Sequence, residues 1–281
     1  MKLASEYSWL TLIQAGDPIA IGIIDETPVW SAPFGETLMA AIHLAPNLRV
    51  LDVGCGLGYP LLELAARLGP TARCVGLDPW NAALGRARSK AQMREHVVTF
   101  QEGIAEAIPF EANAFDLVIS NNGLNNVADI KKALFECFRV AAPGAQFLMT
   151  ANLPETFGTF YSHFEAALEA ANQNSHIQAL RDHRAAKRPP SDRWYRLVSE
   201  AGFGVAAQTY HTFSWHLLDG EALFTHPAFR LSFLPSWVEA VGEDIFETIR
   251  PDLLRRLDAH ARDAGGLEME IPFLLLEAEK P

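Results

Sequence analysis

The sequence predicts an α/β fold: a doubly wound, seven-stranded, mostly parallel sheet with helical insertions. Between residues 49 and 152, five short apolar runs alternate with longer stretches of helical periodicity. Parallel strands need crossover connections, and helices of this length supply them. Two more strand-like runs follow, one over residues 204–215 and one over residues 267–280. The alternation therefore indicates strands that return to one sheet through helices.

Each of these elements follows from its local pattern. The first five strands are predicted for the segments RVLDVG, RCVGLD, VVTFQEG, FDLVIS and AQFLMTAN, in that order. One helix is expected to begin at Pro60, and another covers about residues 81–94. The segment KKALFECFRVA is expected to form a third helix that is ended by Pro143-Gly144, because proline and glycine terminate helices.

The rhythm changes after residue 151. One helix there carries an apolar stripe at helical spacing, made of Phe157, Phe160, Tyr161, Phe164 and Leu168. A later helix is expected to have Ser191 as its N-cap and Gly202 as its stop, and it leads into the sixth strand. Pro251 suits the start of a further helix before the last strand.

These patterns divide the chain into a sheet-forming core and two helical insertions. The segments are residues 1–152 (N-terminal helix and ligand-binding core), 153–190 (helical lid insertion), 191–216 (return helix and strand), 217–266 (second helical insertion) and 267–281 (final strand). Connections this long in compact domains are usually functional. We expect the insertions to form a lid over the carboxyl ends of the strands, where open α/β sheets bind ligands.

Composition narrows the classes of partner. The chain has 281 residues, 23 basic and 34 acidic side chains and a net charge of −11. Such a charge repels nucleic acid and anionic lipid, so we expect a small-molecule partner, no nucleic acid and no membrane. No stretch approaches the roughly 18 apolar residues of a membrane span, and we expect no signal peptide. The sequence leaves the oligomeric state open.

The three cysteines also bear on the compartment. Cys55, Cys74 and Cys137 are an odd number without the spacing of metal ligands, and two of them lie inside apolar runs. We expect reduced, buried thiols in a cytoplasmic protein.

A glycine-rich turn, VLDVGCGLGYP, follows the first strand. Its glycines are Gly54, Gly56 and Gly58, and Tyr59 stands where a dinucleotide fingerprint would have its third glycine. Asp52 precedes them near the end of the strand, where a carboxylate would repel a pyrophosphate. A ligand with cationic groups would gain from it, and S-adenosylmethionine (SAM) has an ammonium, a sulfonium and no phosphate.

A second acidic residue supports this interpretation. Asp78 ends the second strand, where a carboxylate can accept hydrogen bonds from both ribose hydroxyls. Asp78 alone would serve a nicotinamide dinucleotide equally well. The pair of Asp52 and Asp78, together with the glycine spacing, favours SAM.

The segments LDVGCGLG, GLDPW, GIAEAIPF and FDLVISNNG resemble, in order and spacing, the motifs of class I SAM-dependent methyltransferases with their Rossmann-like fold. The resemblance covers about residues 30–152 and is closest to the ubiquinone, menaquinone and arsenite methyltransferases. It implies SAM as the methyl donor and S-adenosylhomocysteine as the product. It implies cofactor-binding roles for Asp52, Gly54, Cys55, Gly56, Gly58, Asp78, Pro79, Trp80, Ala105 and Glu106. Trp30 lies in a segment that in similar enzymes folds over the methionine end of the cofactor, and a core position explains it equally well. Asn121 follows the fourth strand and so faces the ligand edge, which makes it a further cofactor-binding candidate with turn chemistry as its alternative.

One position departs from the pattern of similar enzymes. The segment after the third strand usually reads G-D-A-E, and its aspartate accepts a hydrogen bond from the adenine amino group. Here the segment reads Gly103-Ile104-Ala105-Glu106, so that side-chain acceptor is missing. The resemblance then implies weaker SAM binding or another acceptor, because one hydrogen bond is worth about 0.5–1.5 kcal/mol.

The catalytic candidates are Asn122, Tyr161 and His163. Methyl transfer from a sulfonium is an in-line displacement, which mainly requires positioning and exclusion of water, so a base is needed only for some acceptors. Turn chemistry explains Asn122 better than a role at the site, and a solvent-facing position explains His163 better than a role as a base.

Further side chains are candidates for an acceptor pocket but not for a metal site. The residues His211, His216 and His226 have no metal-ligand spacing. The aromatic residues around them suit either an apolar acceptor pocket or the core of the insertion itself, with the core favoured.

The sequence therefore predicts a SAM-dependent methyltransferase that acts on a small, partly apolar molecule. A catalytically silent SAM-binding regulator or partner-dependent subunit is the alternative, motivated by Ile104 and the missing base. An NAD-dependent oxidoreductase ranks below both, because of the glycine spacing and Asp52.

Overall fold

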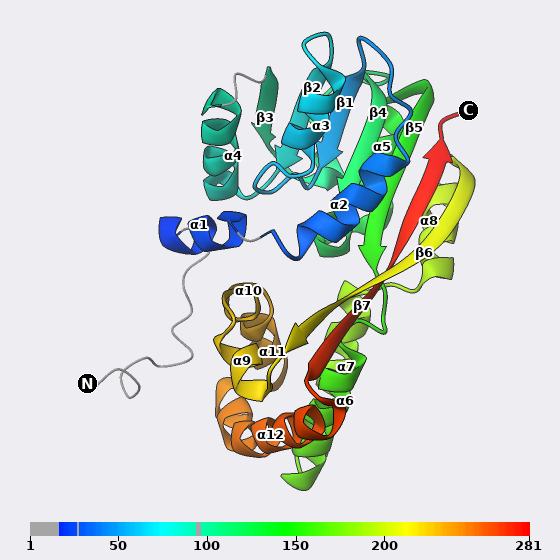
Figure 1. The fold of residues 1–281 in the computed structure, drawn as a ribbon. Helices are drawn as coiled ribbons and strands as arrows, with labels where there is room; N and C mark the ends of the chain where they lie inside the picture. The colour runs from blue at the N-terminus through cyan, green and yellow to red at the C-terminus, as the bar shows by residue number, and fades with distance from the viewer. Residues whose placement is uncertain (1–16, 27, 94–96) are drawn as a thin grey trace. The chain divides into compact units, whose positions relative to one another are not determined.

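A seven-stranded sheet organises the protein in the computed structural model, which describes residues 17–26, 28–93 and 97–281 (Figure 1). The strand order is β3-β2-β1-β4-β5-β7-β6. Strands β1 to β5 run parallel, and β7 lies antiparallel beside β5. The predicted doubly wound, mostly parallel seven-stranded sheet is confirmed. The strands are β1 Arg49–Val53, β2 Arg73–Asp78, β3 Val98–Glu102, β4 Phe115–Asn121, β5 Ala141–Asn152, β6 Gly204–Leu217 and β7 Leu267–Glu279.

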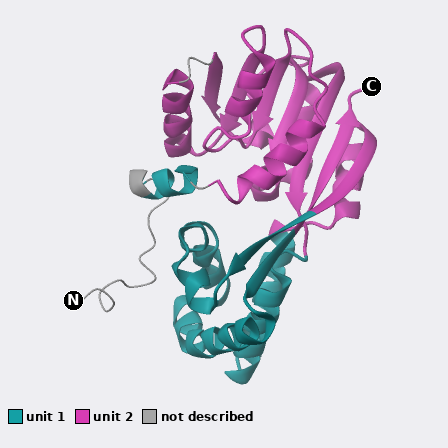
Figure 2. Cartoon of the chain, viewed as in Figure 1, with its two compact units in different colours: residues 1–27, 155–186, 212–271 teal, residues 28–154, 187–211, 272–281 magenta. Residues whose placement is uncertain are grey.

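The chain forms two compact units (Figure 2). Unit 1 comprises residues 1–27, 155–186 and 212–271, and unit 2 comprises residues 28–154, 187–211 and 272–281. Strands β6 and β7 contribute residues to both units. That the insertions act as a lid stays a prediction.

Unit 2 has apolar layers on both faces of its sheet. One core contains Leu51 and Val53 of β1 with residues of α5 and α8, and the other contains Val50 with residues of α2 and α3. A sheet covered on both faces needs apolar residues at consecutive strand positions, which explains why these strands are apolar runs. The helices of this unit are α2 Ser31–Ala40, α3 Leu61–Leu68, α4 Asn81–Met93, α5 Ile130–Val140 and α8 Ser191–Glu200, with short 3₁₀ turns η1 Ala105–Ala107 and η2 Leu124–Asn126.

Unit 1 is a helical assembly with an aromatic core. Phe160 and Trp237 stack at 4.2 Å between ring centroids, and Trp237 Nε1 donates a hydrogen bond to the Tyr161 hydroxyl at 3.0 Å. Phe157 and Phe229 pack beside them. The aromatic residues of the insertions therefore build this unit's own core. Its helices are α1 Pro18–Glu26, α6 Gly158–Ala170, α7 Asn174–Lys187, α9 Gly220–Thr225, α10 Pro227–Ser232, α11 Leu234–Val241 and α12 Glu243–Ala264.

Two predicted helix starts are wrong, and the end of a third helix differs from the prediction by one residue. Helix α12 begins at Glu243 and contains Pro251 in its interior, because Phe246, Ile249 and Leu253 form one buried stripe across the proline. Packing of that stripe outweighs the backbone hydrogen bond that proline removes.

The other two differences are local. Helix α8 has Pro190 at its N-cap position, one residue before Ser191. Helix α5 ends at Val140, before Pro143-Gly144, because β5 begins at Ala141 and pairs there with Phe115. Sheet pairing thus ends this helix earlier than the sequence indicates. Among the described residues, no helix is both long and apolar enough to cross a membrane.

The glycine turn packs so closely against β2 that there is no room for a side chain at Gly76. A Cβ at Gly76 would lie 2.6 Å from Cys55 Sγ and 2.9 Å from Phe100 Cδ1. We expect Gly76→Ala to lower the free energy of unfolding by about 1–3 kcal/mol through overpacking. Gly85→Ala in α4 is the control, because its Cβ meets nothing within 4 Å, and alanine should stabilise the helix by about 0.5–1 kcal/mol. Urea denaturation of both variants measures this, and equal stabilities would contradict it.

Candidate cofactor site at the carboxyl edge of the sheet

The site lies where the strand order reverses. Strand β1 has β2 on one side and β4 on the other, and all three are parallel, so their carboxyl ends meet at one edge. The crossovers leave β1 and β4 in opposite directions, which opens a crevice at this edge. The glycine turn leaves β1 at this point.

The glycine turn is a backbone cradle. Gly54, Gly56 and Gly58 all have positive φ angles, of 80°, 48° and 91°, a region that favours glycine. The amides of Gly54 and Cys55 donate to the Leu77 carbonyl at 2.8 and 3.1 Å, which fastens the turn to β2. A Cβ at Gly56 would meet no atom of the described residues within 4 Å. A ligand can therefore approach the backbone at Gly56.

Asp52 is a fully buried carboxylate beneath this turn. Neither of its oxygens has a hydrogen-bond partner among the described residues. Burial raises the pKa of Asp52 well above its ordinary value, and the nearby charge of Asp78 raises it further. A buried carboxylate without a partner is costly, so the site favours a positive charge placed next to it.

Asp78 holds the turn from the neighbouring strand. Its Oδ2 accepts a hydrogen bond from the Gly56 amide, and its Oδ1 accepts one from the Trp80 amide, both at 2.8 Å. Each carboxylate oxygen has a second lone pair that can accept from a ligand hydroxyl. Asp78 thus ties the cradle to β2.

The other residues predicted around this turn occupy different environments. Cys55 is buried, and burial is the main reason that the pKa of its thiol is raised; its sulfur lies against Gly76. Pro79 is exposed and Trp80 is half-buried.

The segment after β3 supplies the remaining predicted residues near β2. Ala105 is buried, and Ile104 beside it is 50% exposed. Glu106 Oε1 accepts hydrogen bonds from the Ala128 and Asp129 amides at 2.8 and 3.0 Å. Glu106 therefore holds the segment before α5, a role that its sequence position does not indicate.

A polar network joins the ends of β4 and β5. Asn121 Nδ2 donates to the Ser31 carbonyl at 3.1 Å, and Thr150 Oγ1 donates to Asn121 Oδ1 at 3.1 Å. Asn122 has a φ of 54°, and its Oδ1 accepts from the Asn152 amide at 3.1 Å. The structure thus shows the turn chemistry that the sequence offered as the alternative role of Asn122.

Three residues of this network escaped the sequence analysis: Asn125, Thr150 and Asn152. Asn125 Nδ2 donates to Asn152 Oδ1, and both side chains are buried. The signal in the sequence was the pair of polar residues, Thr150 and Asn152, that interrupts an apolar strand near its carboxyl end.

Trp30 precedes α2 and packs on Phe34, with 5.2 Å between ring centroids. The hydrogen bond from Asn121 to Ser31 fastens this segment to the end of β4. Trp30 is therefore held in unit 2 together with the glycine turn.

Tyr161 and His163 lie on α6 in unit 1. The Tyr161 hydroxyl is buried and accepts the hydrogen bond from Trp237. His163 packs against His260 with 5.2 Å between ring centroids, and partial burial lowers its pKa, with smaller effects of His260 and Arg256. The contacts described for these two residues are all within unit 1.

Known proteins resemble this chain at two levels. Residues 51–149 match the family described as methyltransferase domain. The uncharacterized protein Rv1405c of Mycobacterium tuberculosis is 30% identical over 257 residues, which cover 89% of this chain and 87% of that protein. The chain belongs to the class I SAM-dependent methyltransferases.

The similarity to methyltransferases with a stated substrate is more local. Demethylmenaquinone methyltransferase of Symbiobacterium thermophilum is 37% identical over 112 residues, which cover 39% of this chain and 45% of that protein. The match spans about half the length of such relatives. In fold, the chain is similar to the YcgJ protein of Bacillus subtilis, with a TM-score of 0.59, 19% identity, and coverage of 89% of this chain and 98% of that one.

The residues at this edge fit the methyl donor of the family. SAM carries a sulfonium and an ammonium, and Asp52 is a buried carboxylate, without a partner in the described part of the chain, that a cation would stabilise. Gly56 leaves room for close approach to the backbone. Since SAM has no phosphate, it avoids the repulsion that a diphosphate would meet at Asp52.

The raised pKa of Asp52 gives the stability a defined pH dependence. In the unfolded chain Asp52 loses its proton above its ordinary pKa of 3.8, whereas in the folded protein it keeps that proton to a higher pH. The free energy of unfolding of the wild type therefore falls as the pH rises through this range. We expect Asp52→Asn to be more stable than the wild type in urea denaturation, by a margin that widens as the pH rises above the ordinary pKa of 3.8. A margin that is independent of pH would contradict the assignment.

Asp116→Asn is the matched control. The pKa of Asp116 is lowered, mainly by a side-chain hydrogen bond from Arg49. The charged Asp116 carboxylate therefore stabilises the folded protein at pH values above its ordinary pKa, and this stabilisation is lost as the pH falls. The two Asp→Asn variants should therefore show opposite trends with pH.

Proposed function

We propose that this protein transfers the methyl group of SAM to a small, partly apolar molecule and leaves S-adenosylhomocysteine as the product. Family membership supports the proposal, as does the buried carboxylate of Asp52, which lies beneath an open glycine turn and has no partner within residues 17–26, 28–93 and 97–281. The burial of Asp52 is the observation that carries it, since a cationic ligand would stabilise the charged form of a carboxyl group that burial otherwise keeps protonated.

In the proposed complex the chain mainly binds and orients. Asp78 would accept the ribose hydroxyls through lone pairs that the Gly56 and Trp80 amides leave unused. Pro79, Trp80 and the Ala105 amide would line the adenine, while Trp30 and Asn121 would border the methionine end. The floor of the cofactor site would be formed by Gly54, Cys55, Gly56 and Gly58. Glu106 would hold the segment before α5. Bound SAM supplies an electrophilic methyl group on a positively charged sulfur.

Acceptor-side chemistry is proposed for Asn122, Tyr161 and His163. The lowered pKa of His163 leaves its imidazole neutral, and so able to accept a proton, over more of the pH range. A base is needed only if the acceptor atom loses a proton, such as that of a hydroxyl. The net charge of −11 supports a small acceptor rather than a nucleic acid. The three cysteines are unpaired, which supports a cytoplasmic location.

Transfer of label from methyl-labelled SAM to extracts of small metabolites tests the proposal. We expect labelled product with the wild type and less than about a hundredth of it with Asp78→Ala, which removes the ribose acceptors and the hydrogen bonds from the Gly56 and Trp80 amides. Asp116→Asn, at the amino edge of the sheet, should retain transfer. Circular dichroism of both variants separates loss of activity from loss of fold.

Calorimetry separates the alternatives. Binding of SAM and S-adenosylhomocysteine without any labelled product across varied extracts would instead identify a silent SAM-binding protein, for which Ile104 is the motivating residue. The absence of any binding would overturn the cofactor assignment itself.

Replacement of Ile104 by aspartate is expected to increase the affinity for the cofactor. In similar enzymes an aspartate at this position accepts from the adenine amino group, and here the half-exposed Ile104 leaves room for one. We expect Ile104→Asp to tighten S-adenosylhomocysteine binding about 3- to 10-fold by calorimetry, the equivalent of one hydrogen bond. Ile104→Ala, which adds no acceptor, serves as the control. Equal affinities for the two variants would mean that the adenine amino group does not face this position.

A further inference from the structure

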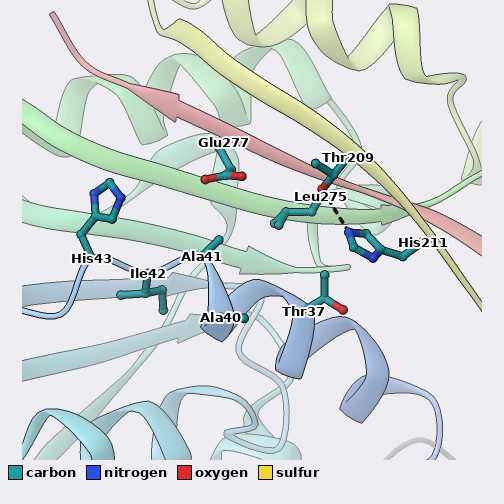
Figure 3. Close-up of a pocket in the computed structure, with 9 residues that line it drawn as sticks. All are labelled: Thr37, Ala40, Ala41, Ile42, His43, Thr209, His211, Leu275 and Glu277. Atoms are coloured by element: carbon teal, nitrogen blue, oxygen red, sulfur yellow. Dashed lines mark hydrogen bonds between the residues drawn. The ribbon is translucent and has the colours of Figure 1, made fainter.

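A groove of about 560 Å³ lies in unit 2, apart from the residues assigned to SAM (Figure 3). One wall comes from α2 and the segment that follows it, and the other comes from β6 and β7. Its lining residues are Thr37, Ala40, Ala41, Ile42, His43, Thr209, His211, Leu275 and Glu277. None of them is among the residues proposed to bind SAM or to act in catalysis.

The sheet register locates the groove relative to the cofactor edge. Leu275 of β7 pairs with Thr150, the residue that bonds Asn121, and Glu277 pairs with Leu148 further from that edge. Side chains two residues apart on a strand share a face. The groove therefore runs along β7, away from the carboxyl edge of the parallel strands.

Glu277 is the unusual residue of this groove. It is half-buried in a run of β7 that is otherwise apolar, FLLLEA, where its face partner Leu275 is buried. Its carboxylate forms no hydrogen bond or ion pair within the described part of the chain. A partly desolvated carboxylate without a partner favours a cation.

The rest of the lining suits an apolar body with ring character. Ile42 and Leu275 are buried and provide an apolar floor. At the end towards the cofactor edge, His211 stacks on Phe273 at 5.3 Å between centroids and an angle of 27°. Figure 3 shows His43 on the wall that faces β7, so imidazoles stand at both ends of the groove.

We propose that this groove is a second ligand site, which binds a small organic amine with an apolar, ring-sized body. The ammonium group pairs with Glu277, and the body lies over Ile42 and Leu275 towards His211. The net charge of −11 draws organic cations to the protein at long range. The site does not depend on the proposed methyl transfer.

Methyl-labelled NMR of the full chain tests this proposal with three probes of similar shape: 2-phenylethylamine, 2-phenylethanol and 3-phenylpropionate. We expect saturable shifts of the Ile42 and Leu275 methyl groups with the amine, at least about tenfold weaker binding of the alcohol, and no saturable binding of the anion, because a charged hydrogen bond is worth a factor of ten or more. Absence of saturation with the amine, or shifts centred outside the groove, overturns the proposal.

The variants isolate the carboxylate. Glu277→Gln should weaken binding of the amine about tenfold and leave that of the alcohol unchanged. Glu270→Gln, the same substitution on the same strand but outside the groove, should bind the amine as the wild type does. Equal affinity of Glu277→Gln and wild type for the amine overturns the ion pair.

Binding of S-adenosylhomocysteine by all three proteins shows that the fold is intact. It also separates the two proposals, because a groove that fails to bind the amine would leave SAM binding untouched, and the reverse holds as well.

Discussion

The cofactor site depends on the attachment of the glycine turn to β2. Two consecutive amides, of Gly54 and Cys55, donate to one carbonyl of Leu77, and Asp78 accepts from Gly56. These bonds turn the backbone sharply at the end of β1 and seal Asp52 beneath it. A carboxyl group is thereby kept away from water at the point where the crevice of the sheet opens, and a cation bound there would stabilise its charged form. The geometry selects against diphosphates and for a cationic nucleoside.

The same attachment explains several choices of residue. Gly76 must lack a side chain because the Cys55 thiol lies on it, and Gly54 approaches Gly123 so closely that a Cβ would lie 3.0 Å from its Cα. The loop after β4 is in turn fixed by Thr150 and Asn152 of β5. The neighbouring strands β2, β1, β4 and β5 thus hold the glycine turn and the loop after β4 in place. The rigid sheet preorganises the site.

The two proposed ligand sites share one feature, a carboxylate that is at least partly shielded from water. Each has a carboxylate without a hydrogen-bond partner among the described residues, fully buried at Asp52 and half-buried at Glu277. Both therefore favour cations, but the first lies beneath a backbone cradle and the second lines a groove between β7 and the segment that contains α2. The deeper burial of Asp52 makes its requirement for a cation the stronger of the two.

Local chemistry made much of the core predictable. The sheet and the glycine turn could be predicted from the sequence because their signals lie in residues that are close together in the chain. These signals are the periodicity of the strands and helices, the glycine spacing and an acidic residue near the end of each of two strands. The predicted start of α12 at Pro251 was wrong because a proline is a local signal, whereas the buried stripe of Phe246, Ile249 and Leu253 is satisfied by packing with distant residues.

Sequence alone determined the class of fold, the cradle and the sign of the charge beneath it, since covalent neighbours set these features. Tertiary structure alone decided that Glu106 holds the segment before α5, that Asn152 anchors the loop after β4, and that Glu277 lines a groove opposite His43. Each of these pairings joins elements far apart in the chain. Their geometry follows from strand order and register, which no local pattern specifies.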